Sequence, residues 1–135
     1  GFVYFHSSTL PYCLFFQGQA ASLGRQHDAG LALAQHDAAA HGVETFVFAP
    51  KEYASKADYE REIVRLLDAA GVELVCLAGY MRIVGDVLLE AYGGRIVNIH
   101  PSLLPAFRGA HAIEQAMEYG VKVFGVTIHY VRSEE

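Results

Sequence analysis

Strand-like and helix-like segments alternate along this chain from residue 45 onward, and this alternation constrains the fold more than any other feature. The strand-like segments are apolar runs, and they cover residues 45–50, 73–78, 95–99 and 121–131. The helix-like segments each end at a glycine, and they cover residues 55–70, 83–92 and 110–119. Such alternation predicts an α/β domain with a mostly parallel sheet and helices on both of its faces.

The helix predicted over 55–70 has the clearest local signals. Ser55 is placed to cap its amino terminus, and Asp58 follows three residues later. An apolar stripe with helical spacing predicts which side faces the core, and it comprises Tyr59, Ile63, Leu66, Leu67 and Ala70. The strand predicted over 73–78 is apolar without interruption, as expected when both faces of a sheet are covered.

The first forty residues differ from the rest of the chain. Residues 1–19 are rich in aromatic side chains without clear alternation, and residues 20–41 are rich in alanine and histidine. Little structure is assigned there. A length of 135 residues suits a single domain over 1–135, atypical over 1–40 and regular from 44 to the end.

Composition excludes several classes of protein. The net charge is −5 and no Lys/Arg cluster occurs, so nucleic-acid binding is not expected. Cys13 and Cys76 are too few for a disulfide framework or a zinc site, and the histidines lack metal-ligand spacing. No apolar run is long enough to cross a membrane. These features predict a cytoplasmic protein with neither a metal nor a membrane partner.

Residues 95–109 carry the strongest sign of chemistry. Asn98 and His100 lie two residues apart at the end of a predicted strand, so their side chains project to the same side. A site that handles charge at a carbonyl group needs both an amide donor and an imidazole. Ligands of open α/β sheets bind outside the carboxyl ends of the strands, where the segment 78–83 also follows its strand. We therefore expect one cleft shared by these two strand ends.

Three runs of sequence resemble a known family. They are L-A-G-Y-M-R-I (77–83), G-R-I-V-N-I-H-P-S-L-L-P-A-F-R-G (94–109) and G-V-T-I-H-Y-V (125–131). Their order and spacing resemble the folate-dependent formyltransferases, in particular the glycinamide ribonucleotide (phosphoribosylglycinamide) formyltransferases of purine biosynthesis. The resemblance covers about residues 44–135, and it implies a Rossmann-like formyltransferase fold.

The resemblance also implies a reaction and its catalytic residues. In that family a formyl group passes from 10-formyltetrahydrofolate, a co-substrate, to the amine of glycinamide ribonucleotide, and no metal takes part. Asn98 matches the asparagine that donates a hydrogen bond to the developing oxyanion. His100 matches the histidine that acts as general acid and electrostatic partner. Preorganised donors at an oxyanion are commonly worth about 3–4 kcal/mol each.

Folate-binding positions follow from the same resemblance. Met81, Arg82, Ile83 and Val84 match the segment that holds the pterin, and Asn98 adjoins the same site. Lys56 matches a basic position associated with the folate. His129 matches a second histidine of the family, whose role is left open.

The sequence also departs from the family. Residues 1–25 contain no Gly-rich phosphate loop, and the chain ends at R-S-E-E (132–135), before the family's catalytic aspartate. The fold is therefore expected to be truncated at both ends, with formyl transfer by this polypeptide alone strongly impaired or lost. A formyltetrahydrofolate hydrolase (deformylase) and a non-catalytic folate-binding remnant are the alternatives. The sequence leaves open a homodimer and the isomer of the Leu104–Pro105 bond.

Overall fold

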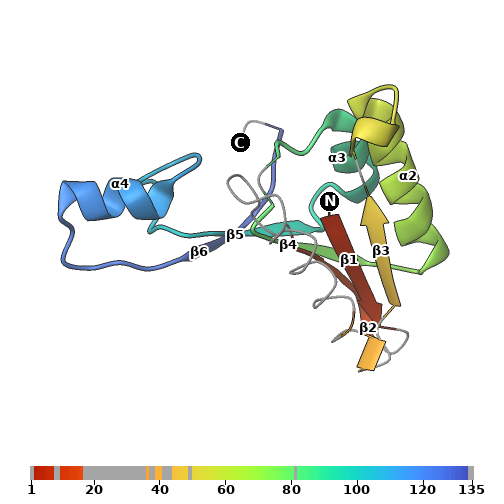
Figure 1. The fold of residues 1–135 in the computed structure, drawn as a ribbon, viewed down its shortest axis with the longest axis horizontal. Coiled ribbons are helices and arrows are strands. Elements are labelled where there is room, and N and C mark those ends of the chain that lie inside the picture. The colour runs from red at the N-terminus through yellow and green to blue at the C-terminus, as the bar shows by residue number, and fades with distance from the viewer. Residues whose placement is uncertain are drawn as a thin grey trace.

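The computed structural model describes residues 2–7, 10–16, 36, 39–40, 44–48, 50–80 and 82–133. The elements, in chain order, are β1 (Phe2–Ser7), β2 (Leu10–Phe16), β3 (Glu44–Phe48), the 3-10 helix η1 (Pro50–Glu52), α2 (Lys56–Ala69), β4 (Leu74–Ala78), α3 (Asp86–Tyr92), β5 (Ile96–His100), α4 (Ala112–Tyr119) and β6 (Thr127–Tyr130). The α/β class expected from the sequence is confirmed (Figure 1).

The strands form one mixed sheet in the order β3-β1-β2-β4-β5-β6. β2, β4 and β5 pair in parallel at its centre, whereas β1 pairs antiparallel with β2 and β3, and β6 pairs antiparallel with β5. Only two residues separate β1 from β2, and a connection that short can join only antiparallel strands. The parallel arrangement expected from the sequence therefore holds at the centre of the sheet and gives way to antiparallel pairs toward both edges.

One face of β4 and β5 carries the core. Val75, Leu77 and Ile96 are buried on that face. The apolar stripe predicted for α2 faces them, with Tyr59, Ile63 and Leu67 fully buried and Leu66 and Ala70 half-buried beside them. Leu88 and Tyr92 of α3 complete the cluster, and the Tyr92 hydroxyl donates a hydrogen bond to Asp68 Oδ1 at 2.8 Å.

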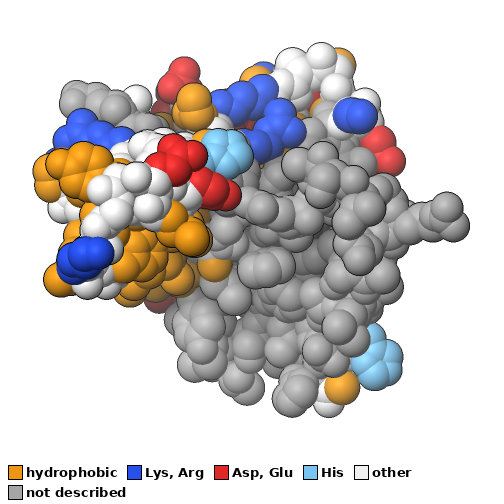
Figure 2. Space-filling view, turned by 60° about the vertical axis from the view of Figure 1, so that its left-hand side comes forward, with side chains coloured by type: hydrophobic (Ala, Val, Ile, Leu, Met, Phe, Trp, Pro, Cys, Tyr) orange, Lys and Arg blue, Asp and Glu red, His pale blue; other side chains and the backbone are white. Residues whose placement is uncertain are grey.

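The opposite face of β5 and β6 is open. Ile99, Ile128 and Tyr130 are exposed on it, and α4 lies apart from α2 and α3 at the far end of the β5–β6 ribbon (Figure 1). Figure 2 shows hydrophobic side chains, in orange, gathered on the left-hand part of the molecule. Residues of α2 and α3 belong to the buried cluster that covers the other face of the sheet.

Several element boundaries differ from those expected. α2 begins as predicted, because the Ser55 hydroxyl accepts a hydrogen bond from the Asp58 backbone N–H at 3.1 Å. α3 begins at Asp86 rather than at 83, and β6 covers only Thr127–Tyr130 rather than 121–131. β1 and β2 form where the sequence indicated no element. Residues 17–35 lie outside the described residues.

A threonine on β6 holds the loop that follows β5. The Thr127 hydroxyl donates to the Ser102 carbonyl at 2.7 Å and accepts from the Leu104 backbone N–H at 3.0 Å. The buried Ser102 hydroxyl donates to the Ala106 carbonyl at 2.6 Å. The Leu104–Pro105 peptide bond is cis.

No helix among the described residues combines the length and apolar character required to span a bilayer.

Replacing Leu67 by alanine tests the packing of α2. Leu67 is 0% exposed, and removal of a buried leucine costs about 2–5 kcal/mol because it leaves a cavity. We expect a fall of this size in the free energy of unfolding, measured by urea denaturation. Met117→Ala, on a residue that is 76% exposed, is the control and should change it by less than about 0.5 kcal/mol. Equal effects of the two changes would contradict the described core.

Replacing Thr127 by valine tests the loop contact. Valine has nearly the same shape but cannot bond the Ser102 carbonyl or the Leu104 N–H, and each unpaired group costs about 1–3 kcal/mol. Amide hydrogen exchange at Leu104 should speed up about tenfold or more. Thr127→Ser keeps the hydroxyl and should preserve the protection. Unchanged exchange in the valine variant would show that the threonine does not hold the loop.

Candidate active site

A row of polar side chains lies on the antiparallel pair β5–β6. Asn98 is opposite His129, and His100 is opposite Thr127. Opposed residues of an antiparallel pair share one face, and this face is the one on which Ile96 is buried. The prediction that Asn98 and His100 lie on the same side is confirmed, and His129 joins them.

Asn98 and His129 are in direct contact. Asn98 Nδ2 lies 3.3 Å from His129 Nε2, and His129 Nδ1 lies 3.2 Å from the Tyr130 carbonyl oxygen. An amide nitrogen can only donate and a carbonyl oxygen can only accept, so Nδ1 carries the ring proton and Nε2 accepts from Asn98. His129 thus fixes the direction of the Asn98 amide.

The loop after β5 fixes the imidazole of His100. His100 Nε2 lies 2.9 Å from the Phe107 carbonyl oxygen, to which it can only donate. The Ser102 hydroxyl points at the same oxygen from 3.4 Å. Phe107 has a φ of 51°, which turns the chain back toward β5, and its ring packs edge-on against Tyr119 of α4 at 5.9 Å between centroids. The remaining nitrogen, Nδ1, makes no hydrogen bond within the described residues.

The segment after β4 lies beside this site. β4 and β5 are parallel neighbours with Ala78 opposite Ile99, so residues 79–85 leave the sheet at the edge where His100 lies. Arg82 is exposed, with its guanidinium carbon 5.9 Å from the centre of the Tyr59 ring. Ile83 is 74% exposed, whereas Val84 belongs to the core. Met81 lies outside the described residues.

A buried glutamate that sequence reasoning missed joins the predicted Lys56 to Gly85, which follows the predicted residues 81–84. Glu60 Oε1 accepts a hydrogen bond from the Gly85 N–H at 2.7 Å and lies 3.9 Å from Lys56 Nζ. Lys56, on α2, and the segment ending at Gly85 therefore meet at this carboxylate. The signal was available, because positions 60, 63 and 67 share one face of a helix.

Burial and charge shift the acidity of two tyrosines near this segment. Burial first, and the Glu60 carboxylate second, raise the pKa of Tyr80 to about 12. Burial also raises the pKa of Tyr59 above its ordinary value. Both tyrosines therefore remain protonated at neutral pH, and neither serves there as a base.

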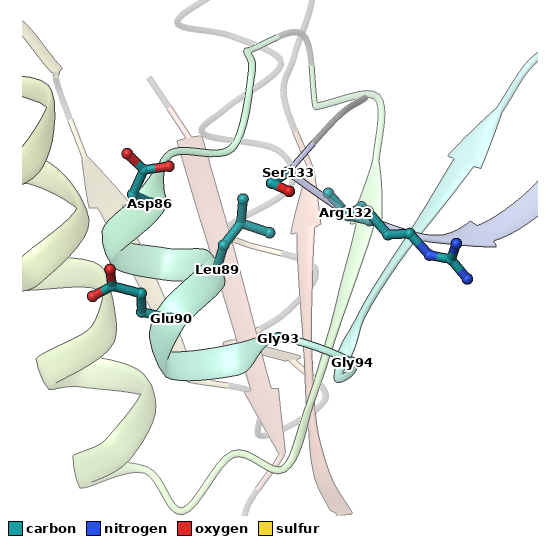
Figure 3. A pocket seen from close by; sticks show the side chains of 8 residues that line it. Asp86, Leu89, Glu90, Gly93, Gly94, Arg132 and Ser133 are labelled. Carbon is teal, nitrogen blue, oxygen red and sulfur yellow. The ribbon is translucent and has the colours of Figure 1, made fainter.

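The pocket drawn in Figure 3 lies elsewhere. It has a volume of about 370 Å³ and is lined by Asp86, Leu89, Glu90, Gly93, Gly94, Val131, Arg132 and Ser133. The Val131 N–H bonds the Ile96 carbonyl at the amino end of β5, so the pocket is at the opposite edge from His100. Leu89 points toward Ser133, whereas the Arg132 side chain points away (Figure 3). No set of three or more potential metal ligands occurs among the described residues.

Comparisons with known proteins identify the family of this chain. A protein-family profile described as Formyl transferase matches residues 17–135. Phosphoribosylglycinamide formyltransferase of Bacillus subtilis (strain 168) is 56% identical over 94 residues, which are 70% of this chain and 48% of that protein. The trifunctional purine biosynthetic protein adenosine-3 of Gallus gallus is 44% identical over 93 residues, which are 69% of this chain and 9% of that protein.

Solved structures give the same result. Glycinamide ribonucleotide transformylase 1 from Geobacillus kaustophilus superposes with a TM-score of 0.62 at 59% identity, over 64% of this chain and 46% of that one. Phosphoribosylglycinamide formyltransferase from Brucella melitensis gives 0.68 at 44% identity, over 78% and 53%. The Rossmann-like fold is thereby confirmed, and the chain spans about half the length of these relatives. Since the profile matches most of its length, the chain belongs to the formyl transferase family.

Proposed function

We propose that the protein containing this chain transfers a formyl group from 10-formyltetrahydrofolate to the amine of glycinamide ribonucleotide. The proposal is carried by the Asn98–His100 pair at the carboxyl end of β5, beside the segment that follows β4. The chain's similarity to phosphoribosylglycinamide formyltransferase supports the choice of substrates. The chain spans 48% of that relative, so the activity is proposed for the whole protein.

The reaction needs stabilisation of one developing charge. The substrate amine attacks the formyl carbon, a C–N bond forms, and the carbonyl oxygen becomes an oxyanion in a tetrahedral intermediate. The bond to the folate nitrogen then breaks, the amine loses a proton and the folate nitrogen gains one. A donor directed at the oxyanion lowers the barrier because it acts on charge that is absent from the ground state.

Asn98 and His100 supply the donors in this proposal. Asn98 Nδ2 donates to the oxyanion, and the contact with His129 keeps the amide from rotating. His100 already donates from Nε2 to the Phe107 carbonyl, which leaves Nδ1 as its second nitrogen. A protonated imidazole donates from both nitrogens, so an N–H at Nδ1 can stabilise the oxyanion and pass a proton to the leaving folate nitrogen.

The segment after β4 holds the formyl donor in this proposal. Ile83 offers an exposed apolar side chain to the pterin ring, and Arg82 and Lys56 offer positive charge to the carboxylates of the folate. Val84 acts through the core, by anchoring the segment in the buried cluster. Met81 belongs to the same segment by sequence.

Single substitutions of Asn98 and His100 by alanine test the catalytic assignment. Each should lower kcat about 10²–10³-fold, the usual effect of removing an oxyanion donor, in an assay of formyl transfer by the intact protein. The dissociation constant of a 10-formyltetrahydrofolate analogue should change less than the rate. His111→Ala, on an exposed histidine, is the control and should leave kcat unchanged. Formate release that is equally fast without glycinamide ribonucleotide would instead indicate a hydrolase.

Replacing Ile83 by serine tests the folate assignment. The side chain is 74% exposed, so the change should leave stability unaltered while it removes an apolar contact worth about 1–2 kcal/mol. Calorimetric titration with the folate analogue should then give binding about tenfold weaker. Val123→Ser, on a side chain that is 73% exposed in another part of the chain, should bind normally. Equal affinities of both variants would remove Ile83 from the site.

A further inference from the structure

Glu60 is a charged side chain on the buried stripe of α2. It is 1% exposed, and an apolar residue there would extend the stripe formed by Tyr59, Ile63 and Leu67. Burying a carboxylate costs free energy unless hydrogen bonds and an opposite charge compensate. Among the described residues, the Gly85 N–H and Lys56 compensate it. Lys56 is itself assigned above to the folate, and Gly85 directly follows the segment assigned to it.

Gly85 lies directly against this carboxylate, with no room for a side chain. A Cβ atom on Gly85 would lie 2.5 Å from Glu60 Oε2, 2.6 Å from Oε1 and 2.8 Å from Cδ. Its φ of −96° is accessible to any residue, so the constraint is space and not backbone conformation. The segment therefore approaches α2 as closely as the absence of a side chain permits.

The same carboxylate acts on the start of the segment. After burial, its negative charge is the second cause of the raised pKa of Tyr80, at the start of the segment. Arg82, between Tyr80 and Gly85, rests over the Tyr59 ring on the preceding position of α2. One turn of α2 thus contacts Arg82 through the Tyr59 ring and Gly85 through Glu60.

We propose that Glu60 is a positioning residue for the formyl donor: its buried carboxylate holds residues 82–85 and Lys56 in the arrangement that binds the folate. This inference rests on the proposed function, since it takes these residues to be the folate site. Glu60 itself makes no contact with the folate. It acts by fixing the groups that do, as a supporting side chain does for a preorganised site.

A double-mutant cycle on Glu60 and Gly85 tests the inference in the intact protein. The probe is a non-transferring analogue of 10-formyltetrahydrofolate, and the readout is its dissociation constant. Glu60→Ala should weaken binding about tenfold, because a buried hydrogen bond to a charged group is lost. Gly85→Ala should weaken binding in the native background, by pressing on the carboxylate, but not in the Glu60→Ala background. If the two substitutions instead weaken folate binding additively, the loss does not come from the Glu60–Gly85 contact and the inference is wrong.

Conservative and control variants separate positioning from general stability. Glu60→Gln retains an oxygen for the Gly85 N–H and loses the charge facing Lys56, so it should bind better than Glu60→Ala. Glu62→Gln, which removes an exposed pairing with Arg65 on the same helix, should bind like the native protein. Native-like circular dichroism is required of each variant, and KM for the formyl donor should rise while kcat changes less.

Amide exchange at Gly85 distinguishes failure of this inference from failure of the proposed function. Loss of Gly85 protection in Glu60→Ala together with weaker folate binding supports the inference. Loss of protection with unchanged binding overturns it and leaves the proposed function standing. Absence of folate binding by the native protein overturns both.

Discussion

Ile63 and Leu67 of α2 form one buried apolar cluster with Val75 of β4, and the rest of the described structure is built on this cluster. In β5 only Ile96, at the amino end, belongs to this cluster, so Asn98 and His100 lie beyond it on the same face. Burial of such side chains is worth about 1.5–3 kcal/mol each, more than any surface ion pair in the chain. The polar positions at the strand ends are therefore supported by a core that they do not interrupt.

The register of β5 with β6 then completes the site. Because the pair is antiparallel, His129 lies opposite Asn98 and Thr127 lies opposite His100. A shift by one residue would move these side chains to the other face of the sheet. Thr127 also holds the loop whose Phe107 carbonyl receives the His100 N–H. One pairing register thus sets the direction of the amide and, through the loop, of the imidazole.

The sequence predicts those parts of the fold that have strong local signals. α2 follows from its Ser55 cap and apolar stripe, and the shared side of Asn98 and His100 follows from strand alternation. β1 and β2 do not follow, because an aromatic-rich hairpin without alternation gains its structure from its neighbours in the sheet. The apolar run 121–131 predicts a longer strand than β6. The observed strand is shorter because pairing with β5 ends at Thr127.

Other parts of the site depend on contacts between distant residues. The Asn98–His129 contact spans 31 positions of sequence and the Glu60–Gly85 contact spans 25, so no local pattern encodes either one. Glu60 is informative because helical periodicity alone places it inside. A carboxylate at a buried helical position needs a donor, and the nearest unpaired donors are the N–H groups at the start of another helix. Gly85 precedes α3 and supplies such a donor. The Glu60 carboxylate on α2 thus binds the backbone at the first turn of α3, directly after the segment proposed to bind folate.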